Sequence, residues 1–203
     1  YDYYDLYAVT GGKVDCNYDG ILWTTIDGVP GWYGFVDGCL TSDQALMKKD
    51  DGTWWYVGEN GMVDFTYTGR AQTAYGEYYI RNGQIDFGAN GFIKDPASDI
   101  YYYYVVNGYV IHELYTVAQG TINGETAWWC VEGGGCVPNA FTGTAEYGGK
   151  VWYYDNSKID FSKSGTYEHS QGLMRNDSTY VSIHYMYEVV NGQVITMTVH
   201  VAE

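Results

Sequence analysis

The chain has few basic residues for its length of 203. Lysine and arginine together number 10, against 25 aspartates and glutamates, which gives a formal net charge of −15. Binding to duplex nucleic acid needs a basic surface, and adsorption to anionic lipid needs clustered lysine and arginine. The shortage of basic residues therefore excludes nucleic acid and anionic membrane surfaces as expected partners.

Long apolar runs are also missing. No stretch approaches the roughly 18 residues that a membrane span requires. The first residues, Tyr1–Asp5, carry two aspartates and do not have the basic and apolar segments of a secretory signal. We therefore expect no membrane insertion, and we expect the chain to be a processed or excised part of a longer protein.

Sequence patterns that carry catalysis or metal binding are absent too. No C-x-x-C pair occurs among the four cysteines, and the four histidines are scattered, at His112, His169, His184 and His200. The nucleophile-elbow, zinc-protease and phosphate-loop patterns are likewise missing. The sequence predicts no metal, no cofactor and no enzyme. A glycosidase built on two carboxylates is the alternative.

Proline is scarce, with 3 residues, whereas the chain contains 24 tyrosines, 7 tryptophans and 27 glycines. Aromatic side chains favour strands and glycine favours tight turns, so this composition indicates many short strands. The aromatic content also argues against disorder, which is typical of chains with little to bury. Ser42–Lys49 is the one segment for which we expect a short helix.

The segment Trp54–Gly69 is the clearest copy of a repeat that runs along the chain. Each copy has a small residue two positions before an aliphatic anchor, and most copies have a glycine six positions after it. Successive anchors lie 22–27 residues apart, with a last interval of 35, at Val14, Leu40, Val63, Ile85, Val110, Val137, Ile159 and Val194. A period in this range indicates stacked supersecondary units.

The turns of the repeat have a recognisable composition. A two-residue asparagine–glycine turn tolerates positive φ at both central residues and joins two antiparallel strands. A turn at Asn82-Gly83 places Arg81 opposite Gln84 and Ile80 opposite Ile85. Such pairs occur at Asn82-Gly83, Asn107-Gly108 and Asn191-Gly192, with a weaker version at Asn156-Ser157.

One hairpin buries too little surface to be stable alone, so each copy must pack on the next. We therefore predict an all-β fold, a solenoid of stacked β-hairpin repeats of about 22–27 residues. Residues 1–166 are expected to form the repeat array. Residues 167–203 are expected to form an enlarged C-terminal capping repeat within the same domain.

The repeat resembles the cell-wall-binding repeats of Gram-positive surface proteins, a group that includes choline-binding and glucan-binding repeats. The similarity spans about Tyr7 to Gly165 and is strongest in Trp54–Gly69, Tyr78–Gly91 and Trp152–Gly165. The Val-Asp-Phe variant resembles repeats in surface proteins of gut clostridia and occurs at Val63-Asp64-Phe65, Ile85-Asp86-Phe87 and Ile159-Asp160-Phe161. The resemblance implies a solenoid of hairpins, secretion, surface attachment and ligand binding between successive hairpins.

One departure from the family pattern bears on the ligand. In choline-binding repeats a tryptophan follows the closing glycine and helps to build an aromatic cage for the cationic head group. None of the corresponding residues is tryptophan in this chain, where they are Ile21, Met47, Arg70, Phe92, Val117, Thr144 and Thr166. The resemblance therefore implies a hairpin repeat without the choline cage.

The aromatic strands supply the candidate ligand-binding residues. Exposed aromatic faces can stack on sugar rings or anchor a protein interface, and the alternative is that these side chains form the core. Adjacent residues of a strand point to opposite faces, so one tryptophan of each neighbouring pair is expected to face outward. The candidates are Trp32, Trp54, Trp55, Tyr79, Trp128, Trp129 and Trp152.

Aspartate directly follows the anchor in four copies, at Asp15, Asp64, Asp86 and Asp160. A residue that recurs once per copy is typical of a structural role, whereas a catalytic pair occurs once. We therefore expect these carboxylates to bond backbone amides of the turns, with binding of a cation or a sugar hydroxyl as the alternative.

Two cysteines flank one of the turns. Cys130 and Cys136 are separated by five residues, Val131–Gly135, and lie on opposite strands of one predicted hairpin. They either form a disulfide that closes this loop or remain free thiols.

These observations predict a secreted or surface-exposed, non-enzymatic binding module. The first hypothesis is attachment to cell-wall or other glycans through exposed aromatic residues. The second is an adhesin that binds a host protein such as an immunoglobulin, which the divergence between copies favours. The third is a passive spacer that holds another domain away from the cell wall.

Overall fold

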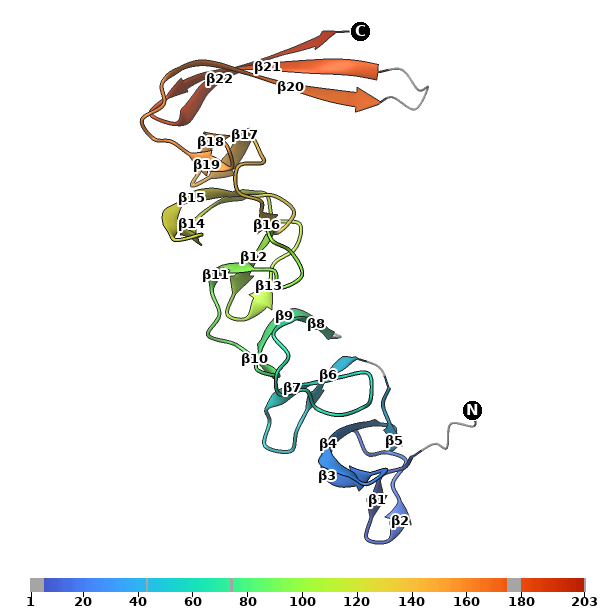
Figure 1. The fold of residues 1–203 in the computed structure, drawn as a ribbon. Coiled ribbons are helices and arrows are strands. Elements are labelled where there is room, and N and C mark those ends of the chain that lie inside the picture. Colours follow the sequence, from blue (N-terminus) through green and yellow to red (C-terminus); the bar gives the residue numbers. More distant parts are fainter. Residues whose placement is uncertain (1–5, 43, 74, 175–179, 203) are drawn as a thin grey trace. The chain divides into compact units, whose positions relative to one another are not determined.

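The computed structural model describes residues 6–42, 44–73, 75–174 and 180–202. Within these residues the chain forms 22 strands and no helix (Figure 1). The prediction of an all-β protein built from hairpins is therefore confirmed. The chain divides into two compact units: unit 1 comprises Tyr1–Asn90 and Val105–Val110, and unit 2 comprises Gly91–Tyr104 and Ile111–Glu203.

The strands of both units are mostly short. Unit 1 contains β1 (Val9–Thr10), β2 (Lys13–Val14), β3 (Gly20–Ile26), β4 (Val29–Val36), β5 (Cys39–Leu40), β6 (Ala45–Lys48), β7 (Trp54–Val57), β8 (Gly69–Thr73), β9 (Gly76–Arg81), β10 (Gln84–Ile85) and β13 (Tyr109–Val110). Unit 2 contains β11 (Gly91–Lys94), β14 (Thr116–Ile122), β15 (Glu125–Val131), β16 (Gly135–Cys136), β17 (Gly143–Tyr147), β18 (Lys150–Asp155), β19 (Lys158–Ile159), β20 (Gly165–Met174), β21 (Tyr180–Val190) and β22 (Gln193–Ala202). The strand β12 (Tyr102–Val106) has residues in both units.

Several repeats consist of a long hairpin followed by a short third strand. In unit 1, β3 pairs with β4 and β4 with β5, and the same antiparallel order recurs for β8, β9 and β10. In unit 2 it recurs for β17, β18 and β19. The glycines that close the sequence repeats are the first residues of the following long hairpins, as seen at Gly20, Gly69, Gly91, Gly143 and Gly165.

The predicted register of the asparagine–glycine turn is confirmed. Arg81 pairs with Gln84 and Ile80 pairs with Ile85 across β9 and β10. The turn residues Asn82 and Gly83 have φ angles of 51° and 78°, which is the left-handed region that this turn requires. Asn107-Gly108, Asn191-Gly192 and Asn156-Ser157 also have positive φ at both positions.

A pair of backbone hydrogen bonds joins each of these turns to the preceding repeat. The N–H of Gly83 donates to the carbonyl of Tyr67 at 2.8 Å, and its own carbonyl accepts from the N–H of Tyr56 at 2.8 Å. We call this pair of bonds the turn clamp. Because the clamp brings the turn against the backbone of another repeat, a Cβ on Gly83 would lie 2.4 Å from the carbonyl oxygen of Asp64. Glycine is required there for space as well as for φ.

The turn clamp recurs in both units. Its two bonds are made by the second residue of the turn, which is Gly38, Gly83 and Gly108 in unit 1 and Gly134, Ser157 and Gly192 in unit 2. Ser157 is the exception to glycine and is fully buried. Its hydroxyl donates to the carbonyl of Val137 at 2.7 Å and accepts from the N–H of Ala140 and Phe141 at 3.2 and 3.0 Å. The buried hydroxyl is thus satisfied by backbone groups.

The core consists of small clusters between successive hairpins. In unit 1, Leu46, Tyr56, Ala71 and Ile80 form one cluster, with two residues from each of two hairpins. In unit 2, the buried side chains Val117, Cys130, Tyr154 and Ile159 form a comparable cluster. Aromatic and aliphatic side chains therefore supply the burial that holds one repeat on the next.

The expected helix over Ser42–Lys49 is wrong, although residue 43 lies outside the described residues. Ala45–Lys48 is the strand β6, which pairs with β7 over its whole length. Leu46 and Met47 are buried in different clusters, as expected for the two faces of a strand. Pairing with the aromatic strand β7 outweighs the weak local preference for helix.

The long strands β20, β21 and β22 lie at the end of the eight-stranded sheet of unit 2, in which β22 also pairs with β18 (Figure 1). Tyr187 and Val189 of β21 are buried against Tyr153 of β18, in the preceding hairpin. The assignment of residues 167–203 to a cap within one domain stays a prediction, and residues 175–179 and 203 of this segment lie outside the described residues. Across the described part of the chain, no helix has the length and apolar character needed to cross a membrane.

The turn clamp predicts unequal costs for two glycine substitutions in unit 1. Gly28 and Gly83 have φ angles of 80° and 78°, but a Cβ on Gly28 would meet nothing within 4 Å. We expect Gly28→Ala to lower the free energy of unfolding by about 1 kcal/mol through backbone strain alone. We expect Gly83→Ala to cost about 1–3 kcal/mol more, because the neighbouring backbone must move.

Urea unfolding of the two variants and the parent chain measures these costs. Equal destabilisation by the two substitutions would show that close packing of the turn against the preceding repeat contributes nothing to stability.

Candidate functional site

One candidate site is an open pocket of about 650 Å³ in unit 2. Its walls come from β14, β15, β19 and the turns next to β18 and β19. The lining residues are Gln119, Glu125, Thr126, Ala127, Trp128, Asn139, Asp155, Asn156, Lys158, Ile159, Asp160, Phe161, Ser162 and Lys163. We call it the unit 2 pocket.

Aromatic rings form the apolar side of the unit 2 pocket. Trp128 of β15 lies edge-on to Phe161, with ring centroids 6.5 Å apart, and packs against Tyr147 at 5.1 Å. Phe161 in turn lies edge-on to Trp152 at 5.4 Å. Trp128 is half-buried and Phe161 is 45% exposed, so both rings offer surface to the pocket.

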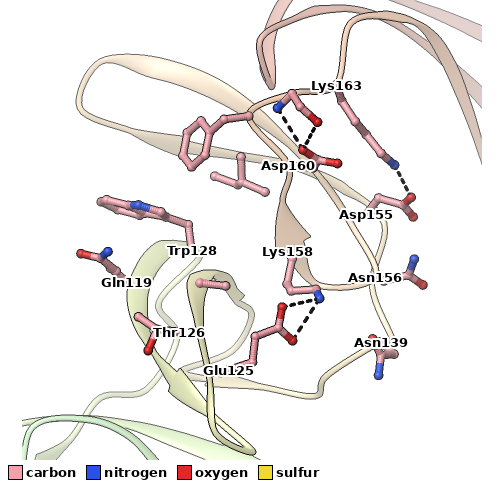
Figure 2. Close-up of a pocket in the computed structure, with 14 residues that line it drawn as sticks. Gln119, Glu125, Thr126, Trp128, Asn139, Asp155, Asn156, Lys158, Asp160 and Lys163 are labelled. Carbon is pink, nitrogen blue, oxygen red and sulfur yellow. Dashed lines mark hydrogen bonds and ion pairs between the residues drawn. The ribbon is translucent and has the colours of Figure 1, made fainter.

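Amide side chains lie along the rest of the pocket. In Figure 2, Trp128 and Gln119 are at one end, and Asn139 and Asn156 are at the other. The side chains of Gln119, Asn139 and Asn156 make no hydrogen bond to another residue that the structure describes. Each of them has donors and an acceptor available to a ligand.

Both lysines of the pocket are paired with carboxylates that also line it. Lys158 Nζ contacts both carboxylate oxygens of Glu125, at 2.8 and 3.2 Å (Figure 2). Lys163 forms an ion pair with Asp155, which also accepts a hydrogen bond from Thr142. The hydrogen bond from Lys163, followed by that from Thr142, lowers the pKa of the Asp155 carboxyl below its usual value.

The anchor-following aspartates behave as structural residues. Asp160 Oδ1 accepts hydrogen bonds from the N–H and the hydroxyl of Ser162, at 2.9 and 2.6 Å, and these bonds lower its pKa. Asp15, Asp64 and Asp86 likewise accept from the N–H two residues further along the chain. The prediction that these carboxylates bond backbone amides of the turns is confirmed.

The predicted aromatic candidates fall into three places. Trp128 lines the unit 2 pocket, and Trp152 is joined to it through Phe161. Trp32 and Trp55 meet in a much smaller pocket of unit 1, and Trp54 packs half-buried against the cluster around Tyr56. The assignment of these five residues as binding residues stays a prediction.

Two of the candidates are buried and need correction. Tyr79 is 6% exposed and Trp129 is 2% exposed. The indole N–H of Trp129 donates to the carbonyl of Gly120 at 3.1 Å, inside the cluster with Tyr102 and Ile122. Of the pair in β15 it is therefore Trp128 that faces the pocket, because Trp129 fills the space between hairpins.

Sequence reasoning missed the phenylalanines of the Val-Asp-Phe segments. Phe65, Phe87 and Phe161 are all exposed, and each lies edge-on to an aromatic residue of the strand before it. Their position two residues after an inward-facing anchor could have identified them in the sequence. Whether their rings face outward, however, depends on the conformation of the turn. Trp23, 60% exposed and edge-on to Trp32, was also missed.

Cys130 and Cys136 are buried free thiols in this structure. Cys130 and the hydroxyl of Tyr154 both donate to Oε1 of Glu132. Burial, as the largest cause, raises the pKa values of Cys130 and Tyr154, and it raises the pKa of Cys136 to about 12. A disulfide between the two cysteines stays a prediction.

Three segments of the chain match the family model described as a choline-binding repeat. They are residues 48–64, 66–86 and 140–160, which together cover less than one third of the chain. Each contains an aromatic strand, namely β7, β9 or β18. No curated protein matches the chain. The chain is thus similar to choline-binding repeats over these three repeats, and the likeness to repeats of gut clostridia stays a prediction.

Because the two tryptophans of β15 differ in burial, we expect their substitution by alanine to lower the free energy of unfolding by different amounts. Trp129→Ala removes a fully buried indole and its hydrogen bond, so we expect a loss of about 3–5 kcal/mol in the free energy of unfolding. Trp128→Ala removes a half-buried ring at a pocket wall, for which we expect a loss of no more than about 2 kcal/mol. Urea unfolding at pH 7 measures both, and a larger loss for Trp128→Ala would contradict this assignment.

The buried thiols and phenols predict a loss of stability at alkaline pH. Burial raises the pKa of Tyr153 to about 12, as it does for Cys136. In the unfolded chain thiols ionise near pH 8.5 and phenols near pH 10, so above pH ~9 the unfolded state binds fewer protons than the native state. The free energy of unfolding should therefore fall from pH ~9 towards pH ~12, by up to about 1.4 kcal/mol per pH unit for each such group.

This dependence is measured by denaturant unfolding between pH 7 and pH 11 in the presence of a phosphine reductant. The double variant Cys130→Ala, Cys136→Ala is the control and should show a shallower fall between pH 9 and pH 10. A parent chain whose stability is constant across this range would contradict the burial of these groups.

Proposed function

We propose that this chain is a non-enzymatic surface module that attaches to cell-wall or other glycans through the unit 2 pocket. The observation that carries the proposal is the combination, in one open pocket, of the Trp128 and Phe161 rings with three amide side chains that make no hydrogen bond to another described residue. A sugar ring has apolar C–H faces and a rim of hydroxyls. An aromatic wall and free amides complement these two features.

The charge of the pocket also favours a neutral ligand. Its two lysines are already paired, Lys158 with Glu125 and Lys163 with Asp155. A phosphate or sulfate group would have to displace a carboxylate from one of these pairs. Hydroxyl groups can bind without disturbing them, so an uncharged glycan fits the pocket better than an anion does.

The carboxylates of the pocket are poorly suited to glycoside hydrolysis, which supports a binding module without activity. A general acid needs a carboxyl whose pKa is raised so that it is protonated near neutral pH. Asp155 and Asp160 have lowered pKa values because they accept hydrogen bonds. Glu125 is held by Lys158. We therefore propose that the chain binds without catalysis and uses no metal or cofactor.

The family likeness supports a location for this protein and a first ligand to test. Choline-binding repeats occur in surface proteins that attach to the cell wall, and three segments of this chain match their model. We therefore propose a secreted or surface-exposed location and a cell-wall glycan as the first ligand to test.

A second candidate is an adhesin that binds a host protein such as an immunoglobulin. Ile195, Met197, Val199 and Val201 of β22 are between 45% and 56% exposed, on a strand without charged residues. Exposed apolar strands of this kind can form the centre of a protein interface. The third candidate, a passive spacer, predicts no binding at all.

Pull-down with isolated wall polysaccharide and, separately, with host serum tests the proposal. The parent chain should be retained on the polysaccharide, and Trp128→Ala should weaken retention about ten-fold, the effect of losing roughly 1.4 kcal/mol of stacking. Asn156→Ala should weaken it as well. Trp23→Ala removes an exposed tryptophan outside the pocket and is the matched control, with retention like that of the parent.

Three outcomes would overturn the proposal. Retention of one serum protein with no glycan binding would favour the adhesin, and inertness in both assays would favour the spacer. Glycan binding that survives Trp128→Ala and is lost in Trp23→Ala would move the site away from the unit 2 pocket.

A further inference from the structure

A second aromatic site lies in unit 1 and is filled by the chain itself. It is a small apolar pocket with about 30 Å³ of free volume, lined by Ile21, Trp32, Lys49, Trp55, Val63 and Phe65. Trp55 and Phe65 lie edge-on with centroids 5.1 Å apart. The ammonium group of Lys49 lies over the ring of Trp32, at 4.2 Å from its centroid. This is cation–π distance.

The turn that carries Lys49 holds its ammonium group in place. The N–H of Lys49 donates to the carbonyl of Thr53, and the N–H of Gly52 donates to the carbonyl of Lys49, both at 2.8 Å. Lys49 Nζ also forms an ion pair with Asp51 at 3.2 Å. Hydrogen bonds from Thr53 are the largest cause that lowers the pKa of Asp51, to about 2, so this carboxylate is charged at neutral pH.

The same turn is tied to the aromatic wall. The hydroxyl of Thr53 accepts from the indole N–H of Trp55 at 2.8 Å and donates to Asp51. Trp32, the Lys49 ammonium, the Asp51 carboxylate, Thr53 and Trp55 thus form one connected set of interactions. The cation is placed between an aromatic face and a carboxylate.

A matching set of rings in unit 2 shows what Lys49 replaces. In unit 1 the residue opposite Trp55 is Met47, and Lys49 is two positions further along the chain. In unit 2 the residue opposite Trp152 is Ala145, and the residue two positions further is Tyr147.

Tyr147 packs on Trp128 in unit 2, as Lys49 lies over Trp32 in unit 1. Trp152 and Phe161 then correspond to Trp55 and Phe65, which make the same edge-on contact. At this position unit 1 has the ammonium group of Lys49, whereas unit 2 has a fourth ring, that of Tyr147.

We propose that Lys49 is a specificity-determining residue, an internal cation that occupies the aromatic site of unit 1 and closes it to external quaternary ammonium compounds. The remaining 30 Å³ is about the share of a single water molecule and is too small for a tetramethylammonium ion. An external cation would also meet the positive charge of Lys49 at a short distance, where like charges repel.

Removal of Lys49 should therefore convert the pocket into a cation site. Trp32, Trp55 and Phe65 would still offer their rings, and Asp51 would lose its ion-pair partner and supply a negative charge. Aromatic rings around a quaternary ammonium group attract it through their negative faces. Ile21 stands where choline-binding repeats have tryptophan, but the site still has aromatic walls. The cation inside it is the side chain of Lys49.

The test uses Trp128→Ala as the parent, so that the related rings of unit 2 do not respond. Tetramethylammonium chloride is titrated against this parent and against the same chain with Lys49→Ala, and the indole N–H signals of Trp32 and Trp55 are followed by NMR. Sodium chloride at the same ionic strength is the salt control. Lys48→Ala is the matched control variant, because Lys48 is an exposed lysine one residue earlier.

We expect saturable shifts of the Trp32 and Trp55 signals in the Lys49→Ala chain, with a Kd at least about ten-fold lower than in the parent or in the Lys48→Ala chain. If the parent binds tetramethylammonium as tightly as the Lys49→Ala chain does, Lys49 does not close the site to external cations. A folded Lys49→Ala chain without saturable shifts would show that the rings do not form a cation site. Either result overturns the proposal, whether or not the chain binds glycans.

A measurement on the unsubstituted chain covers the case in which Lys49→Ala does not fold. The rates at which lysine amines react with an acylating reagent are compared by peptide mass mapping. An ammonium group held between Trp32 and Asp51 should react at least about ten-fold more slowly than that of Lys48, because it must leave both partners first. Equal rates for Lys48 and Lys49 would show that the ammonium group is not held in the pocket and would overturn the proposal.

Discussion

The turn clamp is the constraint on which the rest of the structure depends. A hairpin turn with two positive φ angles places one residue so close to the preceding repeat that its N–H and carbonyl both bond to that repeat's backbone. A side chain at this residue meets the neighbouring carbonyl, so glycine recurs there, and Ser157 is accepted only because its hydroxyl bonds three backbone groups. Because the clamp fixes the spacing of neighbouring hairpins, it also fixes which aromatic rings meet.

The aromatic sites follow from this spacing. Where Ser157 clamps two repeats of unit 2, Trp128 of one hairpin and Trp152 of the next both meet Phe161, the phenylalanine after the anchor. What each site can bind then depends on the few residues that differ between copies. Amide groups and an open pocket distinguish the site of unit 2, whereas Lys49 fills the site of unit 1. The repeats therefore share one framework, and the few residues that differ between copies determine what each site can bind.

Much of the framework could be predicted from sequence because it depends on local backbone chemistry. The register of Ile80 with Ile85 and the bonding of Asp160 within its turn follow from residues that are neighbours in the chain. The strand at Ala45–Lys48 could not be predicted, because its partner β7 outweighs its own preference. The burial of Trp129 and the seat of Lys49 on Trp32 also depend on contacts between hairpins that periodicity does not specify.

We propose that the divergent pocket of unit 2, with Trp128 as its wall, is the place where this repeat fold binds its ligand. The most direct measurement is a titration of the isotopically labelled chain with a soluble cell-wall oligosaccharide, following the indole N–H signals of all 7 tryptophans. We expect a saturable shift of the Trp128 signal, a smaller one for Trp152, and none for the buried Trp129 or for Trp23 of unit 1. Saturable shifts confined to Trp23, or no shift of any indole at saturating oligosaccharide, would contradict it.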